Sequence, residues 1–185
     1  MKKRIVILDY DGTVTDAEAE GTPFLEAYRG ALMIFSGLPR DEARELVESL
    51  ERQVTTNSQG GWECDGKIVA PATDPFLRVR PLACAVFDHL GLFQKPSDRA
   101  LLLGFLYLTL YKAHAGYVPR PDASMFLRQL LGMKGVFVYV VTNSGTESVQ
   151  DKIARLDVGF DPKHVIGLAK KFVVGDKPSN IATTI

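Results

Sequence analysis

The segment Ile5-Val-Ile-Leu-Asp-Tyr-Asp-Gly-Thr-Val-Thr-Asp16 decides the fold expected of this 185-residue chain. Residues 4–8 form an apolar run rich in β-branched side chains. Such a run predicts a strand buried on both faces, as in a parallel sheet. Two acids, Asp9 and Asp11, follow at its carboxyl end. Because residues i and i+2 of a strand point the same way, both carboxylates can address one bound group.

Asp9 and Asp11 are therefore the first candidate catalytic residues. One carboxylate can attack phosphorus and form an aspartyl-phosphate, while the other protonates the leaving oxygen and then activates water. Mg²⁺ is the expected cofactor, because a hard cation between a carboxylate and a phosphate oxygen offsets their repulsion. Gly12 permits the turn that must follow. Asp-Gly is also an ordinary turn signal, so a plain surface turn is the alternative.

A second buried strand is predicted over 136–141 (VFVYVV), and it ends in Thr142-Asn143-Ser144. Hydroxyl and backbone N–H groups at the carboxyl edge of an open α/β sheet can bind phosphate oxygens. The alternative is that Ser144 or Thr146 only caps the following helix. We list Gly12 and Thr13 with Asn143 and Ser144 as candidate phosphate-binding residues.

Strands and helices alternate in both terminal parts of the chain, which predicts an α/β fold with a parallel sheet. A third, shorter strand is expected at 165–168, with another apolar stretch at 172–174. A helix over 146–156 has Thr146 as its expected N-cap. Another helix opens at Pro121-Asp122, and four of its residues are expected to face the core: Phe126, Leu127, Leu130 and Leu131.

The middle of the chain has a different pattern. Helices are predicted around 24–35, from Asp41 to Val54, over 83–90 and from Ser97-Asp98 to Ala113, with a polar, glycine-rich loop at 55–65. We therefore divide the chain into a discontinuous α/β core, 1–14 and 115–185, and a mostly helical insertion, 15–114. The most apolar run, 100–113, is about 14 residues long. That is too short to span a bilayer and predicts a buried helix instead.

Composition narrows the function classes. The chain is 46% hydrophobic and 24% charged, and its 22 basic residues balance its 22 acidic ones. No global field recruits nucleic acid or an anionic membrane, so phosphate handling must come from local groups. Two cysteines, Cys64 and Cys84, make neither a metal-binding spacing nor a disulfide scaffold, which favours a cytoplasmic protein. A cation is also needed near the acids, and the candidates are Lys170, Lys171 and Lys177.

These residues resemble the haloacid dehalogenase-like hydrolase superfamily, in its phosphatase and phosphoglucomutase-like branch. Asp9-Tyr-Asp-Gly-Thr-Val-Thr is similar to the first motif of that family, the strand ending in Thr142-Asn143 to the second, and Lys177-Pro178 to the third. The resemblance implies a Rossmann-like parallel-sheet core with an α-helical cap inserted between the first and second motifs. The 15–114 insertion lies in that place.

The resemblance also implies individual roles. Asp9 is expected to be the nucleophile and a metal ligand, and Asp11 the general acid/base and a second metal ligand through its backbone carbonyl. Thr142 is expected to hydrogen-bond the transferring phosphoryl group, and Lys177 to steady the nucleophile and the phosphate. An acid at position 11 favours phosphoryl transfer over dehalogenation. The expected activity is Mg²⁺-dependent hydrolysis of a small phosphorylated metabolite, with a mutase as the close relative.

The chain departs from the family at the fourth motif, an acid-bearing strand that follows the lysine after a helix. Only eight residues follow Lys177. A rival alignment takes 172–176 as that strand, Asp176 as its acid and Lys170 or Lys171 as the third-motif lysine, but it leaves no room for a crossover helix. We expect a truncated form, an edge supplied by a partner chain, or a catalytically silent binding or regulatory module. The sequence leaves the oligomeric state open.

Overall fold

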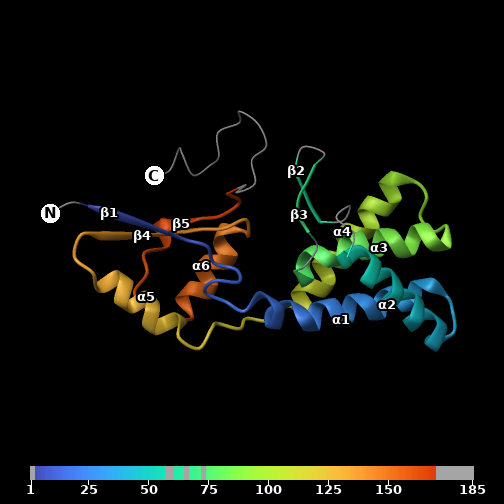
Figure 1. Ribbon diagram of the computed structural model, residues 1–185, viewed down its shortest axis with the longest axis horizontal. Helices are drawn as coiled ribbons and strands as arrows, with labels where there is room; N and C mark the ends of the chain where they lie inside the picture. Colours follow the sequence, from blue (N-terminus) through green and yellow to red (C-terminus); the bar gives the residue numbers. More distant parts are fainter. Residues whose placement is uncertain (1–2, 57–60, 65–66, 72–73, 170–185) are drawn as a thin grey trace. The chain divides into compact units, whose positions relative to one another are not determined.

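The structure is a computed structural model that describes residues 3–56, 61–64, 67–71 and 74–169. The chain forms two compact units (Figure 1). Met1–Ala17 and Tyr117–Ile185 make the first, which we call the α/β unit, and Glu18–Gly116 make the second, which we call the helical unit. The protein is thus mixed α/β, as the sequence predicts.

The α/β unit contains a three-stranded parallel sheet in the order β1-β4-β5. Its elements are β1 (Arg4–Leu8), α5 (Ala123–Gly132), β4 (Val136–Val141), α6 (Thr146–Ala154), the 3-10 helix η1 (Pro162–His164) and β5 (Val165–Ile166). The register pairs Arg4 with Val136 and Leu8 with Val140. Parallel strands bring their carboxyl ends to one edge of the sheet, which places the residues after β1 and β4 side by side.

One face of this sheet is covered by α5 and α6, which lie on the same side of it in Figure 1. Val140 packs there with Leu127 of α5 and with Val149 and Ile153 of α6, and all four are buried. Apolar burial at about 25 cal/mol per Å² makes this layer the main stabilising contact of the unit.

The prediction that both faces of β1 are buried is wrong. Ile5 and Ile7 are 54% and 52% exposed. β1 is an edge strand of the sheet that the described residues form, and both side chains lie on the face opposite α5 and α6. Phe126 is also exposed, although it was expected to face the core. Leu127 alone among the four expected residues of α5 is fully buried, because a ten-residue helix buries a narrow stripe.

The helical unit contains α1 (Ala17–Ser36), α2 (Arg40–Thr56), α3 (Pro75–Leu90) and α4 (Pro96–His114), with a hairpin of β2 (Gly61–Cys64) and β3 (Lys67–Pro71). Its core joins α1, α2, α3 and α4 around side chains such as Phe24, Leu32, Val47 and Leu82. Phe24 contacts the rings of Tyr28, Phe76, Tyr107 and Tyr111 with centroids 5.2 to 6.0 Å apart. This aromatic cluster ties α1, α3 and α4 together.

Three expectations about this unit need correction. The 55–65 segment is not wholly a loop, because 61–64 pair with 67–71 as antiparallel strands. A helix was expected only over 83–90, but α3 begins at Pro75 and includes Pro81. Its start is fixed by Asp74, whose side chain caps the helix by accepting from the N–H groups of Phe76 and Leu77. Helix α4 is only partly buried. Leu103 and Leu106 are buried, whereas Leu101, Phe105 and Leu108 are exposed.

Three further observations bear on the sequence-based predictions. The apolar stretch 172–174 and the candidates Lys170, Lys171 and Lys177 lie outside the described residues. The third strand is shorter than expected and ends at Ile166. Within the described part of the chain, no helix combines the length and the apolar character that crossing a bilayer requires.

Candidate active site

The site is built where β1 and β4 end. Because Leu8 pairs with Val140, Asp9 and the residues that follow it emerge beside the segment that begins at Thr142. Both segments leave the sheet at its carboxyl edge, where ligands of open α/β sheets bind. Seven of the eight candidate residues come from these two segments: Asp9, Asp11, Gly12, Thr13, Thr142, Asn143 and Ser144.

A tight turn follows β1 and is anchored by Tyr10, which is fully buried. The carbonyl oxygen of Tyr10 accepts hydrogen bonds from the backbone N–H groups of Thr13, Val14 and Thr15 at 3.2, 2.8 and 3.3 Å. Gly12 has φ of 80°, a conformation that side chains disfavour, so glycine is required for the backbone here. The turn and the buried Tyr10 side chain thus anchor the backbone between Asp9 and Asp11.

Asp11 is the residue on which the site converges. Its Oδ2 accepts hydrogen bonds from Thr142 Oγ1 at 2.9 Å and Ser144 Oγ at 2.7 Å. Its Oδ1 lies 3.9 Å from Lys152 Nζ, an ion pair from α6. The structure therefore brings the first and second candidate segments into direct side-chain contact across the sheet edge.

The second segment is held firmly by backbone bonds. The N–H of Thr142 donates to the carbonyl of Ile166 at 2.9 Å, and the N–H of Ala169 donates to the carbonyl of Thr142 at 3.0 Å. The N–H of Ser144 donates to Thr142 Oγ1 at 3.0 Å, which orients that hydroxyl toward Asp11. Thr142 is fully buried, so its hydroxyl has little freedom to turn elsewhere.

The helix-capping alternative does not describe Ser144 or Thr146. The N-cap of α6 is Gly145, which makes no side-chain bond, and Thr146 is the first helical residue. The Ser144 hydroxyl goes to Asp11 instead. Thr146 has a close neighbour: a Cβ on Gly167 would clash with the Thr146 backbone nitrogen. Glycine at 167 thus allows the segment after β5 to approach the start of α6.

The remaining candidates lie around this contact. Asp9 is exposed, and its Oδ1 accepts a hydrogen bond from the N–H of Tyr10 at 2.7 Å. Gly12 and Thr13 are exposed on the turn, and Asn143 is half-buried between Thr142 and Ser144. Lys177, and with it the predicted cation of the site, lies outside the described residues.

The structure places two basic residues at the site, Lys152 and Arg120, and the sequence prediction missed Lys152. Lys152 lies in the last turn of α6, with its side chain only 15% exposed. Its spacing of three residues from Val149, which is buried against the sheet, is a signal that could have identified it. Arg120 donates from Nε and Nη2 to the carbonyl of Gly12 at 3.2 and 2.8 Å. A residue 108 positions from Gly12 in the sequence carries no local signal for such a contact.

The donor chemistry of the site fits Mg²⁺. The described residues contain no group of three or more His, Cys, Asp or Glu arranged around a metal position. The exposed Asp9 carboxylate and the backbone carbonyl of Asp11 nevertheless supply oxygen donors at one strand end, and Mg²⁺ commonly takes one or two carboxylates with water and substrate phosphate.

Comparison with known proteins does not assign the chain to a family. No family model matches the chain, and no curated protein matches it in sequence. The function must therefore be argued from the residues of the chain itself.

Proposed function

We propose that this protein is a phosphohydrolase of the haloacid dehalogenase-like type that cleaves a small phosphorylated metabolite through an aspartyl-phosphate. The observation that carries this proposal is the convergence on Asp11 of Thr142, Ser144 and Lys152, with Asp9 two residues away at the same strand end. On this proposal the sheet belongs to a Rossmann-like core and the helical unit is its cap.

The two acids divide the reaction between them. Asp9, whose carboxylate is exposed, attacks phosphorus as the bond to the leaving oxygen breaks, and Asp11 gives that oxygen a proton. Asp11 then takes a proton from water as the water oxygen attacks the aspartyl-phosphate and releases phosphate and Asp9. The hydroxyls of Thr142 and Ser144 hold the Asp11 carboxyl group beside the second strand segment, where the scheme needs it.

The hydroxyl residues have a second partner in this scheme. Thr142 and Ser144 donate to Asp11 in the structure, and both can transfer a hydrogen bond to a phosphoryl oxygen when substrate enters. Asp9 and the carbonyl of Asp11 are the groups that would hold Mg²⁺, which supplies charge neutralisation between carboxylate and phosphate. Asn143 and the turn residues Gly12 and Thr13 line the same edge.

The test is hydrolysis of an aryl phosphate with Mg²⁺ by the wild-type chain and by Asp9→Asn. We expect metal-dependent turnover that falls by at least about a thousandfold in the variant, since asparagine is not a comparable nucleophile. Asp151→Asn on α6 is the matched control, because it makes the same change at an exposed position. Equal loss in both variants would contradict a specific role for Asp9.

A catalytically silent binding module on the same fold is the second candidate. The observation that favours it is the lack, among the described residues, of a third acid beside Asp9 and Asp11. Folded wild-type protein that hydrolyses no member of a broad phosphate-ester panel, yet binds inorganic phosphate with an affinity that Ser144→Ala reduces, would support the binding module over the enzyme.

A further inference from the structure

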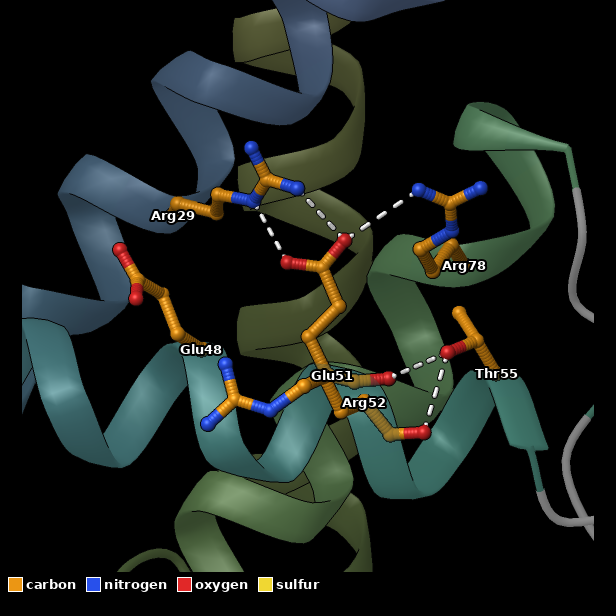
Figure 2. A pocket seen from close by; sticks show the side chains of 6 residues that line it. All are labelled: Arg29, Glu48, Glu51, Arg52, Thr55 and Arg78. Carbon is orange, nitrogen blue, oxygen red and sulfur yellow. Dashed lines mark hydrogen bonds and ion pairs between the residues drawn. The ribbon is translucent and has the colours of Figure 1, made fainter.

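A second polar site lies wholly within the helical unit. A pocket of about 470 Å³ opens between α1, α2 and α3, and Figure 2 shows its lining side chains: Arg29, Glu48, Glu51, Arg52, Thr55 and Arg78. This volume is within the range of small-molecule sites. None of these residues has a part in the chemistry proposed at the end of β1.

Glu51 is the buried centre of the pocket. Its side chain is 7% exposed and accepts from Arg29 Nε and Nη2, both at 2.6 Å, and from Arg78 Nη1 at 3.3 Å. Figure 2 shows the two guanidinium groups on either side of the carboxylate. Burial raises the pKa of Glu51, but the hydrogen bonds and charges of Arg29 and Arg78 outweigh burial and bring that pKa below its usual value. Glu51 is therefore ionised at neutral pH.

The lining of the pocket is rich in arginine. Among the described residues, three arginines and two glutamates line it. Arg29 is 35% exposed, so part of its guanidinium group faces the solvent beyond Glu51. Arg52 is exposed, and it has no ion-pair partner among the residues that the structure describes. An anion in this pocket would meet Arg52 and the exposed part of the Arg29 side chain.

We propose that this pocket binds a small molecule through a carboxylate or phosphate group. Planar guanidinium groups match both anions with paired hydrogen bonds and are more weakly hydrated than ammonium groups. Glu51 has a positioning role, because its bonds hold Arg29 and Arg78 in place before the anion arrives. A ligand then does not have to restrict the rotamers of these two side chains, which is a large part of the cost of binding.

The Glu51 cluster also joins α1, α2 and α3, and a purely structural ion cluster accounts for Arg29 and Arg78 equally well. The two ideas differ at Arg52. A structural cluster has no use for a third arginine that makes no bond to Glu51, whereas an anion site does. Variants at Arg52 and Glu48, both exposed on α2, therefore separate the two ideas without removing a buried group.

The experiment titrates the full chain with inorganic phosphate and, separately, with succinate, at ionic strength held constant with chloride. The ¹⁵N side-chain signals (Nε–Hε) of Arg29 and Arg78 are followed by NMR, so that phosphate bound at the sheet edge is not mistaken for phosphate in this pocket. We expect saturable shifts with at least one anion. Arg52→Gln should weaken that binding about fivefold, the effect of one charge-assisted hydrogen bond in a partly exposed site, and Glu48→Gln should strengthen it.

Arg44→Gln is the matched control, since Arg44 is exposed on the same helix and does not line the pocket. Saturation with phosphate alone would define the ligand as a phosphoryl compound, and saturation with succinate alone as a carboxylate; either result supports the proposal. Shifts that stay linear with concentration, or that weaken equally in Arg52→Gln and Arg44→Gln, would overturn it and leave the cluster a structural one.

Discussion

Lys152 adds a positive charge to an acid that two hydroxyl groups already hold. Its Nζ lies 3.9 Å from Asp11 Oδ1, while Thr142 and Ser144 occupy Oδ2. The side chain is only 15% exposed, so solvent screens this pair less than a surface salt bridge. We infer that Lys152 is a positioning residue, which keeps the Asp11 carboxylate facing the second strand segment.

Replacing Lys152 by methionine tests this role. We expect kcat for aryl phosphate hydrolysis to fall by roughly tenfold with KM nearly unchanged, because orientation of Asp11 affects the transition state and not the binding of substrate. Lys152→Arg should restore much of the rate, since it keeps the charge. Lys163→Met, an exposed change in the same unit, is the control. A rise in KM with unchanged kcat would contradict a positioning role.

At this scale the sequence predicted residue types better than contacts. Acids after one apolar strand and hydroxyls after the next are visible in the sequence, and the strand register then brings Asp11 to Thr142 and Ser144. Both hydroxyls donate to Asp11 and not to Asp9. This choice depends on the side-chain geometry of the turn, which the sequence pattern does not predict. The contact between Arg120 and Gly12 could not be predicted either, because the two residues are 108 positions apart in the sequence.

Among the secondary-structure elements, α1 and α3 are in close contact at Gly21. A Cβ on Gly21 would lie 2.7 Å from Pro75 Cβ and 3.0 Å from Phe76 Cε2. Pro75 is the first residue of α3, and its ring has no rotamer that would move that atom away. Gly30 lies in the same helix α1, and a Cβ there would meet no atom within 4 Å.

The two glycines should therefore respond in opposite ways to alanine. Gly21→Ala is expected to lower the free energy of unfolding by about 1 to 3 kcal/mol, because α1 and α3 must separate to admit the methyl group. Gly30→Ala should raise it by about 0.5 to 1 kcal/mol through helix propensity. Urea unfolding followed by circular dichroism measures both. If Gly21→Ala also stabilises the protein, the close approach is wrong.

Element boundaries and burial were predicted unevenly, for physical reasons. The amphipathic pattern of α2 is unambiguous, and the helix runs from Arg40 to Thr56 as expected within one or two residues. The apolar run in α4 correctly predicted a helix but not its burial, because hydrophobic composition does not show which side chains are covered, and Leu101, Phe105 and Leu108 are exposed. The β2–β3 hairpin was missed, since polar, glycine-rich sequence is typical of loops as well as turns.

At the scale of the whole molecule, each unit has a hydrophobic core of its own. Phe24, Leu32 and Val86 belong to a cluster whose members all fall between residues 18 and 116. Tyr10, Leu127 and Val140 belong to another, formed entirely by the segments on either side. Separate cores are the usual mark of domains that can unfold separately. A condition that acts on side chains found in only one core should therefore destabilise the unit that contains that core.

High pH is such a condition for the helical unit. Burial raises the pKa of Tyr28 well above its usual value, and it raises that of Tyr107 from 10.0 to about 12. A raised pKa in the folded state means that the stabilising effect is complete below pH 10, where both states are protonated, and is lost as the pH rises from 10 toward 12. We expect the free energy of unfolding of this unit to fall by roughly 1 to 2 kcal/mol over that range.

Tyr107→Phe should make this fall smaller while leaving the free energy of unfolding at pH 7 nearly unchanged, as urea unfolding at a series of pH values would show. A variant with the same pH dependence as the wild-type chain would mean that Tyr107 ionises without cost in the folded protein, and hence that the aromatic cluster around Phe24 admits water.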